Sequence, residues 1–358
     1  MKLAILGGGQ LARMMSLSAH TLGIKTICLD PSPEACAKEV TEVITAPLMD
    51  ESALDKLLEN ADFVTIETEN IPLSLVEYVC KHKAFYPSVN ALAVSQDRLL
   101  EKSFLNSLNI PTARFREVSS NDVLHQAYSE LGKSILKTRR LGYDGKGQFV
   151  IKSEKDIETG WKDLQDKALI LEQFIPFKFE VSLIGVRSKD RHLRFYPLVR
   201  NYHQEGILRW SEVILDNPSL QKEAEGIVTT ILTTLDYVGT LCVEFFYDGT
   251  HLLVNEMAPR VHNSGHWTIE GAYTSQFENH LRAIFDLPLG STEAIGHSFM
   301  LNCISEMPSI TQCLSIPGAH FHQYGKTAKP NRKLGHVTLV DTNFPRFQAS
   351  KRLLTDVS

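Results

Sequence analysis

The sequence lacks the features that mark membrane proteins and nucleic-acid-binding proteins. Its apolar stretches all fall short of the roughly 20 residues that a membrane-spanning helix needs. Leu3–Leu6 is too short for the apolar region of a secretory signal and is followed at once by glycines. No basic stripe carries interleaved aromatics, and the formal net charge is −5. We therefore expect a cytoplasmic protein that binds neither membranes nor nucleic acids.

Paired cysteines are also missing. None of the six cysteines forms a C-x-x-C motif, and several lie in apolar runs, where buried free thiols are expected. This usage fits a reducing compartment. Hydrophobic residues make up 43% and charged residues 22% of the chain, as in ordinary globular proteins. A length of 358 residues is enough for about two or three domains.

What the sequence does have, at its start, is a strand–glycine turn–helix–strand unit. Leu3–Leu6 predicts a strand, 11–22 a helix and Thr26–Leu29 a second strand. Gly7-x-Gly9-x-x-Ala12, with Asp30 about 20 residues on, matches the dinucleotide-binding fingerprint. Two other interpretations stay open: an anion held at the helix N-terminus, or a turn that only lets helix and strand pack closely.

A second candidate position follows the predicted strand Phe63–Glu67. Glu69 and Asn70 come just after its C-terminal end, where open α/β sheets bind ligands. The alternative is that Asn70 caps the helix that Pro72 introduces. The alternation of strands and helices stops near residue 95, where we place a domain boundary.

The predicted strands Ser134–Lys137 and Phe149–Ile151 flank a loop rich in glycine and cations. Such a loop can cover a polyphosphate, because glycine lets backbone N–H groups approach and Lys or Arg neutralises charge. It is not a Walker A loop. A mobile basic hairpin is the alternative. Further on, the predicted strand 168–171 runs into Glu172–Pro176, an edge suited to adenine, with Glu180 spaced to meet a ribose.

The segment Val254–Trp267 gathers a carboxylate, two amides, a guanidinium and two imidazoles. It follows a predicted hairpin that carries Glu244. With a three-residue loop, residue 244 would pair with Val254, and Glu244 and Glu256 would be diagonal neighbours on one face. Two such carboxylates repel unless a cation lies between them, and Mg²⁺ suits oxygen ligands. The alternative is two acids on the solvated face of an edge hairpin.

The C-terminal part concentrates positive charge in Lys326, Lys329, Arg332 and Lys333. Side chains that face inward would form an anion site, whereas side chains that face outward would be a solvated charge run.

Together these motifs resemble the ATP-grasp superfamily and, within it, the N5-carboxyaminoimidazole ribonucleotide synthetases. The segments that carry the resemblance are Gly7–Met14, Glu67–Asn70, Lys137 with Gly142–Gln148, Glu172 and Gln173 with Glu180, Asn201–Ile207, Asn255–Trp267 and Lys326–His336. The resemblance implies a mixed α/β and α+β fold. We expect an N-terminal Rossmann-like parallel-sheet domain over 1–95, an ATP-grasp domain over 96–290 with a lid at about 115–185, and a small β-rich C-terminal domain over 291–358.

The resemblance also assigns residues. For ATP it implies Arg98, Lys137, Gly142, Tyr143, Asp144, Gly145, Lys146, Gly147, Gln148, Glu172, Gln173, Phe174, Ile175, Glu180, His203, Asn255 and Glu256. For Mg²⁺, with Mn²⁺ as an alternative, it implies Glu244 and Glu256. For aminoimidazole ribonucleotide it implies Gln10, Leu11, Glu69, Asn70, Arg260, His262, Asn263, Lys326, Arg332 and Lys333. For catalysis it implies Asp144, Arg260, His262 and Lys326. Two positions depart from the wider pattern, Ala258 at the metal site and Ala12 in the glycine turn.

The implied activity is ATP- and bicarbonate-dependent carboxylation of the ribonucleotide through carboxyphosphate, with loop 138–148 closing as a lid, in a homodimer. Three competing hypotheses stay open. They are another ATP-grasp ligase, such as a formate-dependent glycinamide ribonucleotide formyltransferase or a biotin carboxylase; a Rossmann oxidoreductase; and a non-catalytic nucleotide-binding protein.

Overall fold

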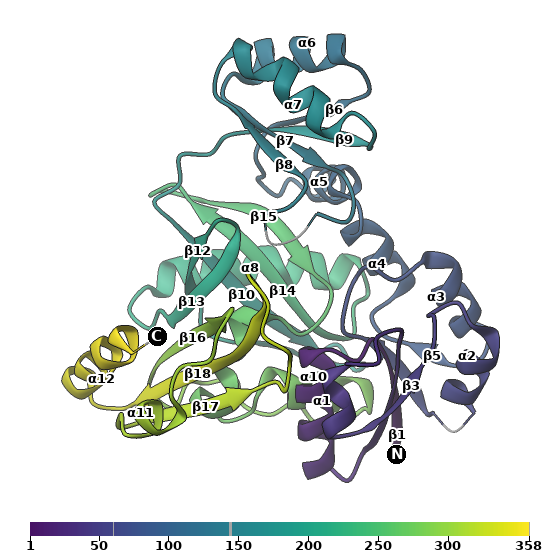
Figure 1. The fold of residues 1–358 in the computed structure, drawn as a ribbon, viewed down its shortest axis with the longest axis vertical. Coiled ribbons are helices and arrows are strands. Elements are labelled where there is room, and N and C mark those ends of the chain that lie inside the picture. The colour runs from purple at the N-terminus through teal and green to yellow at the C-terminus, as the bar shows by residue number, and fades with distance from the viewer. Residues whose placement is uncertain (60, 143–144, 358) are drawn as a thin grey trace.

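The computed structural model describes residues 1–59, 61–142 and 145–357, and its strands form three sheets. A five-stranded sheet comes first in the chain. A four-stranded sheet lies at one end of the long axis, and a nine-stranded sheet lies beside the five-stranded one at the other end (Figure 1). The predicted fold class is confirmed: a parallel sheet is followed by antiparallel sheets with helices packed on them.

The N-terminal sheet is fully parallel, with strand order β3-β2-β1-β4-β5. Its strands have near-continuous Val, Ile and Leu because both faces are covered. The glycine turn joins β1 to α1, as the sequence predicted. The elements are β1 (Lys2–Leu6), α1 (Gln10–Thr21), β2 (Lys25–Asp30), β3 (Glu42–Thr45), α2 (Glu51–Leu58), β4 (Phe63–Ile66), α3 (Leu73–Cys80), β5 (Ala84–Phe85) and α4 (Val89–Ser95).

The four-stranded sheet is antiparallel, with order β6-β9-β7-β8, and α6 and α7 pack against it. Asp97 caps the helix α5 that leads into it by accepting a hydrogen bond from the N–H of Leu99. The elements are α5 (Arg98–Ser107), β6 (Phe115–Val118), α6 (Asn121–Leu131), β7 (Ser134–Thr138), β8 (Gln148–Ile151), α7 (Ile157–Leu164) and β9 (Leu169–Gln173).

The nine-stranded sheet has the order β15-β14-β10-β12-β13-β16-β18-β17, with β11 paired to β10. Its C-terminal strands join through β13 and β16, so the end of the chain completes the central sheet (Figure 1). The elements are β10 (Phe179–Arg187), β11 (Leu193–Phe195), β12 (Val199–Gln204), β13 (Ile207–Val213), α8 (Pro218–Thr234), β14 (Gly239–Tyr247), β15 (Leu252–Ala258), the 3₁₀ turn η3 (Asn263–Gly265), α9 (Thr268–Gly271), α10 (Gln276–Ile284), β16 (His297–Ile304), α11 (Ile310–Leu314), β17 (Ala319–Gln323), β18 (Lys333–Asp341) and α12 (Phe344–Asp356).

One hydrophobic cluster holds the three regions together. It contains Leu11 and Met15 from α1, Val261 and Phe277 from the middle of the chain, and Tyr324 from the C-terminal part. A shared hydrophobic core fixes the three regions relative to one another, whereas a polar interface between them would allow them to move. The domain boundaries predicted at 95 and 290 stay predictions, because this core crosses both.

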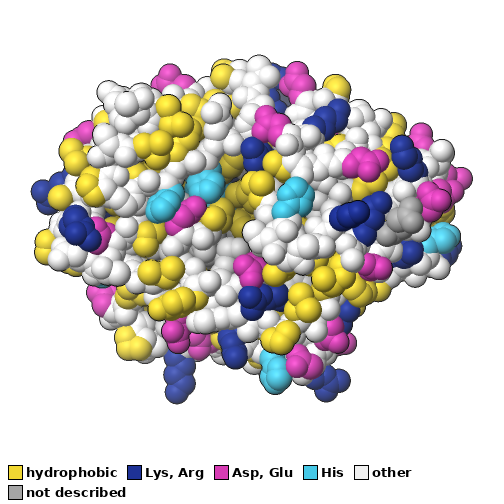
Figure 2. Space-filling model, turned by 90° about the horizontal axis from the view of Figure 1, so that it is seen from below, with side chains coloured by type: hydrophobic (Ala, Val, Ile, Leu, Met, Phe, Trp, Pro, Cys, Tyr) yellow, Lys and Arg dark blue, Asp and Glu magenta, His cyan; other side chains and the backbone are white. Residues whose placement is uncertain are grey.

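All six cysteines are free, and five are buried as predicted, while Cys80 is exposed. Within the described parts of the chain, no helix combines the length and the apolar character that a membrane span requires. On the face seen from below in Figure 2, acidic and basic side chains are intermixed.

Candidate active site

The glycine turn after β1 is already filled by the protein's own carboxylates. The N–H of Gly9 donates to Glu67 Oε1 at 2.5 Å and that of Ala12 to Glu67 Oε2 at 3.1 Å, while Gly8 N–H donates to Asp30 at 2.7 Å. A Cβ at Gly9 would lie 2.6 Å from Glu67 Oε1. The dinucleotide interpretation is therefore wrong: Glu67 occupies the anion position at the helix N-terminus, and Asp30 faces the turn instead of a ribose.

A contact between the two ends of the chain lies beside this turn. Lys326, in the loop between β17 and β18, donates a hydrogen bond to Gln10 Oε1 at the start of α1. Burial lowers the pKa of Lys326 from its usual value. Leu11, next to Gln10, is buried in the shared core. The structure thus brings Gln10, Leu11 and Lys326 together, as the resemblance implies.

The predicted cationic segment borders a cavity. Lys326, Lys329, Arg332 and Lys333 line a cavity of about 650 Å³, and Lys146 from the glycine-rich loop joins them. The remaining lining residues are Gln10, Gly145, Glu205, Ile207, Pro330 and Asn331. Five cations and one acid line this cavity, and such an excess of positive charge favours a phosphorylated ligand. Lys326, Arg332 and Lys333 are partly buried here, whereas Lys329 is exposed, so the anion site stays a prediction.

Arg260, in the segment after β15, is paired with Glu69, in the segment after β4. Its guanidinium Nε donates to Glu69 Oε2. Although burial favours the neutral acid, Arg260 holds the pKa of Glu69 below its usual value. Gln96 fixes the backbone of this segment by donating to the carbonyls of Glu69 and Ile71. Asn70 is exposed and is not a helix cap, because α3 begins at Leu73 after Pro72.

Glu244 and Glu256 lie directly opposite each other on neighbouring strands, and not as the diagonal neighbours that the sequence predicted. Val254 pairs with Phe245, and a bulge at this point places Glu256 directly across from Glu244. The predicted pairing of 244 with 254 is wrong because the loop between the strands has four residues, not three, and because the bulge adds one more. Glu244 is only 9% exposed, so the solvated-edge alternative is also wrong for this residue.

The pair is electrostatically strained without a cation. Burial raises the pKa of Glu244 to about 7. The charge of His203 lowers this pKa, whereas the charges of Glu256 and Glu180 raise it further. Burial acts on Glu256 too, but Arg98, whose Nη1 donates to Glu256 Oε2 at 3.0 Å, lowers its pKa. Two facing carboxylates with opposite shifts fit a divalent cation that would let both ionise. In the described ranges, no group of three or more His, Cys, Asp or Glu is arranged to hold a metal.

Glu172 is held by two buried lysines. Lys137 Nζ lies 2.9 Å and Lys102 Nζ 3.4 Å from Glu172 Oε2, while Oε1 is buried without a partner. Against the effect of burial, Lys102 and Lys137 lower the pKa of Glu172 to about 2. Lys137 and Glu172 were predicted at the ATP site from the sequence, whereas Lys102 was not. Lys102 lies on the buried face of α5, which only the packing of that helix reveals.

Glu101 is a second residue of this region that was not predicted from the sequence. It accepts a hydrogen bond from the N–H of Met257 at 2.7 Å, and burial raises its pKa to about 8. Lys102 donates to the carbonyl of Asn255. These two contacts join α5 to the bulged strand β15 and fix the position of the Glu256 backbone.

The edge predicted for a nucleotide base continues from Glu172. His203 on β12 contacts Glu180 on β10, with Nδ1 2.7 Å from Oε2, and this bond raises the pKa of His203 although burial opposes it. Gln173 ends β9, and Lys133 lies over the Phe174 ring. Ile175 follows at the partly exposed edge.

The glycine-rich loop between β7 and β8 lies against the turn between β12 and β13. A Cβ at Gly145, where φ is +76°, would lie 2.6 Å from the Glu205 carbonyl oxygen. Gly142 O accepts a hydrogen bond from Arg98 at 3.1 Å, and Gly147 O accepts one from the N–H of Thr138. Gln148 begins β8. Tyr143 and Asp144, both predicted at the site, lie outside the described residues.

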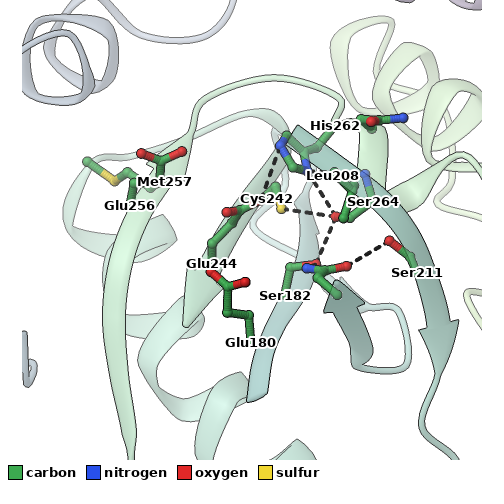
Figure 3. Close-up of polar contacts among 12 residues, drawn as sticks. Glu180, Ser182, Leu208, Ser211, Cys242, Glu244, Glu256, Met257, His262 and Ser264 are labelled. Carbon is green, nitrogen blue, oxygen red and sulfur yellow. Dashed lines mark hydrogen bonds and ion pairs between the residues drawn. The ribbon is translucent and has the colours of Figure 1, made fainter. Parts of the chain in front are cut away.

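The segment after β15 places His262 beside Glu244, with Nε2 3.4 Å from Oε1 (Figure 3). Burial and the nearby Arg260 keep the pKa of His262 well below its usual value. Asn263 forms a reciprocal amide pair with Asn302 at 3.0 and 2.8 Å. That pair fixes η3 to β16, and a role for Asn263 toward substrate stays a prediction.

Comparisons with known proteins cover nearly the whole chain. Three family models match in succession: a ribonucleotide synthetase preATP-grasp domain at 1–96, an ATP-grasp domain at 103–277 and a phosphoribosylaminoimidazole carboxylase C-terminal domain at 298–350. The N5-carboxyaminoimidazole ribonucleotide synthase of Pseudomonas aeruginosa is 47% identical over 340 residues, which cover 95% of this chain and 94% of that protein.

Solved structures agree with this match. The N5-carboxyaminoimidazole ribonucleotide synthetase of Thermus thermophilus superposes with a TM-score of 0.95 at 46% identity, covering 99% of this chain and 98% of the other. The Aspergillus clavatus enzyme in complex with ADP and 5-aminoimidazole ribonucleotide has a TM-score of 0.92 at 32% identity, with the same coverage. The chain therefore belongs to the N5-carboxyaminoimidazole ribonucleotide synthase family of ATP-grasp enzymes.

Proposed function

We infer that the protein is an ATP-grasp ligase that carboxylates 5-aminoimidazole ribonucleotide to N5-carboxyaminoimidazole ribonucleotide in purine biosynthesis, with formation of ADP and phosphate. The observation that carries this inference is that an acid pair suited to a cation lies near a cationic cavity suited to a phosphate. Glu244 and Glu256 pair across two strands, and Lys333, which lines the cavity, acts electrostatically on Glu244. The Aspergillus relative, solved with ADP and the ribonucleotide, supports it.

ATP would lie between the four-stranded and nine-stranded sheets. Lys137 and Arg98 supply charge for its phosphates, and the loop 142–148 would cover them. The partnerless Oε1 of Glu172, together with the Gln173–Ile175 edge, offers polar groups to the base, and Glu180 with His203 offers them to the ribose. Asn255 and Glu256 would complete this side. Closure of the loop would exclude water from the transferring phosphoryl group.

Mg²⁺, or Mn²⁺ in its place, fits the facing carboxylates. Glu244 and Glu256 are the residues that would hold it, and their opposed pKa shifts give the physical reason. When bound, the ion would neutralise charge on the phosphate oxygens. With Ala at 258, its other ligands would be phosphate and water.

The ribonucleotide would lie where the N-terminal and C-terminal parts meet. Lys326, Arg332 and Lys333 would hold its phosphate in the cavity beside Gln10 and Leu11. Glu69, Asn70 and the Arg260–Asn263 segment would surround the imidazole. The Arg260–Glu69 bond presents a fixed guanidinium to an incoming carboxylate.

In the reaction, a bicarbonate oxygen attacks the terminal phosphorus of ATP, which releases ADP and gives carboxyphosphate. Loss of phosphate then gives CO₂ or its equivalent, which the exocyclic amine attacks with loss of a proton. Lys137 and Arg98 stabilise charge on the phosphoryl group, and Arg260 and His262 bind the new carboxylate. Trapping of the reactants supplies effective concentration for a weak nucleophile. We propose that Asp144 accepts the proton that the amine loses.

The test is phosphate release from ATP with aminoimidazole ribonucleotide and bicarbonate each omitted in turn. Full release should require both. Release that depends on formate or biotin instead would indicate another ATP-grasp ligase. Quenching or enhancement of nicotinamide fluorescence without ATP hydrolysis would indicate an oxidoreductase, and nucleotide binding without turnover a non-catalytic protein. The homodimer is tested separately by sedimentation, and the cytoplasmic location by fractionation.

A further inference from the structure

A chain of buried hydroxyl and amide groups ends on the ring of His262 (Figure 3). Ser211 on β13 donates to Asn201 Oδ1 at 2.7 Å, and Asn201 Nδ2 donates to Ser182 Oγ at 3.0 Å. Ser182 Oγ donates to Ser264 Oγ at 2.8 Å, and Ser264 Oγ lies 2.9 Å from His262 Nδ1. The four residues before His262 are between 0% and 5% exposed, so no solvent competes for these bonds.

The direction of this chain is fixed by its members. The Asn201 amide can only donate from Nδ2, so the Ser182 oxygen accepts there and its hydroxyl proton goes to Ser264. Ser264 then has its own proton for His262 Nδ1 at 2.9 Å, since the Cys242 sulfur at 3.8 Å is the more distant and weaker acceptor. The backbone N–H of Ser264, which can only donate, also points at Nδ1 at 3.3 Å. Two donors therefore converge on one ring nitrogen, which must be the acceptor.

The other ring nitrogen then carries the hydrogen. His262 Nε2 lies 3.4 Å from Glu244 Oε1, so Nε2–H faces a carboxylate. The opposite tautomer would place a lone pair against Glu244 and an N–H against the N–H of Ser264. Both contacts would be repulsive in a buried site, where electrostatic interactions are strong.

The backbone of His262 is held as firmly as its ring. Its N–H donates to Gln276 Oε1 at 2.9 Å, and its carbonyl accepts from Gln276 Nε2 at 2.6 Å. Gly265 lies so close to Ile184 that a Cβ would fall 2.2 Å from that side chain. With the backbone fixed by α10 and β10, Ser264 supplies both donors to Nδ1, and its hydroxyl at 2.9 Å is the closer of the two.

We propose that Ser264, itself oriented by Ser182 and Asn201, is a positioning residue that holds His262 as the Nε2–H tautomer with its donor aimed at Glu244 and the reacting carboxyl group. The kinetic part of this proposal rests on the proposed function, whereas the tautomer does not. His262 thereby acts as a fixed hydrogen-bond donor in the carboxylation step, and it takes no proton from the amine.

The direct test is ¹⁵N NMR of the histidine rings in the nucleotide-free enzyme. The His262 signals are assigned by their loss in His262→Gln. In the wild type, Nδ1 should show the shift of an unprotonated nitrogen and Nε2 that of a protonated one. In Ser264→Ala the closer donor is lost and only the backbone N–H at 3.3 Å remains, so both shifts should move part of the way toward the average of a tautomer mixture. A wild-type ring protonated at Nδ1, or an unchanged ring in Ser264→Ala, would overturn the proposal.

The kinetic test compares Ser264→Ala with Ser350→Ala, which removes a buried hydroxyl from α12, remote from the site. Loss of an outer hydrogen-bond partner of this kind costs about 10- to 100-fold in activity. We expect that fall in kcat for carboxylation with the KM for ATP unchanged in Ser264→Ala, and no change in Ser350→Ala. Equal kcat values in the two variants would contradict a positioning role.

Ser182→Ala keeps the Ser264 hydroxyl and is the second test variant, which replaces Ser264→Ala if that protein does not fold. It removes the donor that orients Ser264, so the same NMR displacement and a smaller fall in kcat are expected. Ribonucleotide-independent phosphate release in the wild type would refute the proposed function and leave the NMR result standing.

Discussion

At the residue scale, the site is built from ionisable groups that burial alone would neutralise. Glu244 and Glu256 face each other, Glu172 lies between two lysines, and Arg98 joins Glu256 to the glycine-rich loop. Each charge has an opposite charge within hydrogen-bond reach except Glu244, whose neighbour across the strand is another acid. That imbalance is the reason to place a cation there.

Glu256→Gln should abolish turnover while leaving the fold intact. The amide keeps the size of the side chain and can still accept from Arg98, but it removes the negative charge that a divalent ion needs. We expect kcat to fall by on the order of 100-fold or more, with a thermal midpoint at or above that of the wild type because the repulsion with Glu244 is relieved. Phosphate release and thermal unfolding are measured beside Glu77→Gln, an exposed acid of α3. Persisting activity would remove the metal assignment.

His280 should make stability depend on pH. Its Nδ1 accepts from the N–H of Thr240 and its Nε2 contacts Thr65 Oγ1, so the buried ring is neutral. Burial lowers its pKa to about 4. Since the unfolded ring titrates near 6.5, the unfolded state binds more protons between these values. The free energy of unfolding should therefore fall as the pH drops from about 6.5 toward 4, by up to about 3 kcal/mol from this residue.

Urea titrations at a series of pH values compare the wild type with His280→Gln. The variant should have a shallower decline of unfolding free energy below pH 6.5, whatever its stability at neutral pH. Parallel declines in the two proteins would show that His280 does not set the slope.

At the element scale, two hairpins position the chemistry. The bulge in β15 places Glu256 across from Glu244, and the turn between β12 and β13 receives the glycine-rich loop. The turn has positive φ at Glu205 and Gly206, as a tight two-residue hairpin requires. Gly145 meets this turn with a positive φ of its own, so the loop approaches it backbone to backbone.

Gly145→Ala should impair closure of the loop over ATP. The added Cβ would meet the Glu205 carbonyl oxygen, and a left-handed conformation costs a non-glycine residue on the order of 1–3 kcal/mol. We expect kcat/KM for ATP to fall about tenfold or more. The control is Gly226→Ala in α8, where nothing lies within 4 Å and helix propensity improves. Equal kinetics in both variants would show that the loop closes without this contact.

At the scale of the whole molecule, the cavity proposed for the ribonucleotide forms where the two ends of the chain meet. Lys326 and Gln10 are 316 positions apart. The hydrophobic cluster that contains Leu11, Val261 and Tyr324 holds the three regions in register, and Gly325 contacts Glu39 of the N-terminal part. A ligand in the cavity therefore stabilises the arrangement of all three.

Lys326→Met should weaken binding of the ribonucleotide and spare that of ATP. Methionine keeps the apolar stem, while loss of a charged hydrogen-bond donor should raise the KM for the ribonucleotide roughly tenfold to hundredfold. The ribonucleotide should also raise the thermal midpoint of the wild type and have less effect on the variant. Lys167→Met, an exposed lysine, is the control. An unchanged ribonucleotide KM in Lys326→Met would remove Lys326 from the site.

Many of the strands and helices, and the residue types of the site, could be predicted from local sequence. Alternating strands and helices up to about residue 95, the glycine-rich loop and the residue types of Val254–Trp267 were all readable, because each depends on neighbours within a few positions of the chain. From them came the fold class, the acid pair and the cationic segment. Lys102 and Glu101 escaped, because only packing against β15 distinguishes them from surface charges of a helix.

Tertiary structure alone decided which groups were already satisfied and which faced a ligand. It filled the glycine turn with Glu67, 58 positions from Gly9, which removed the dinucleotide interpretation. It placed the bulge that brings Glu256 opposite Glu244, gathered the cations of 326–333 at one cavity, and paired Asn263 with Asn302. These outcomes depend on strand register and on contacts between distant segments, which residue spacing along a chain does not specify.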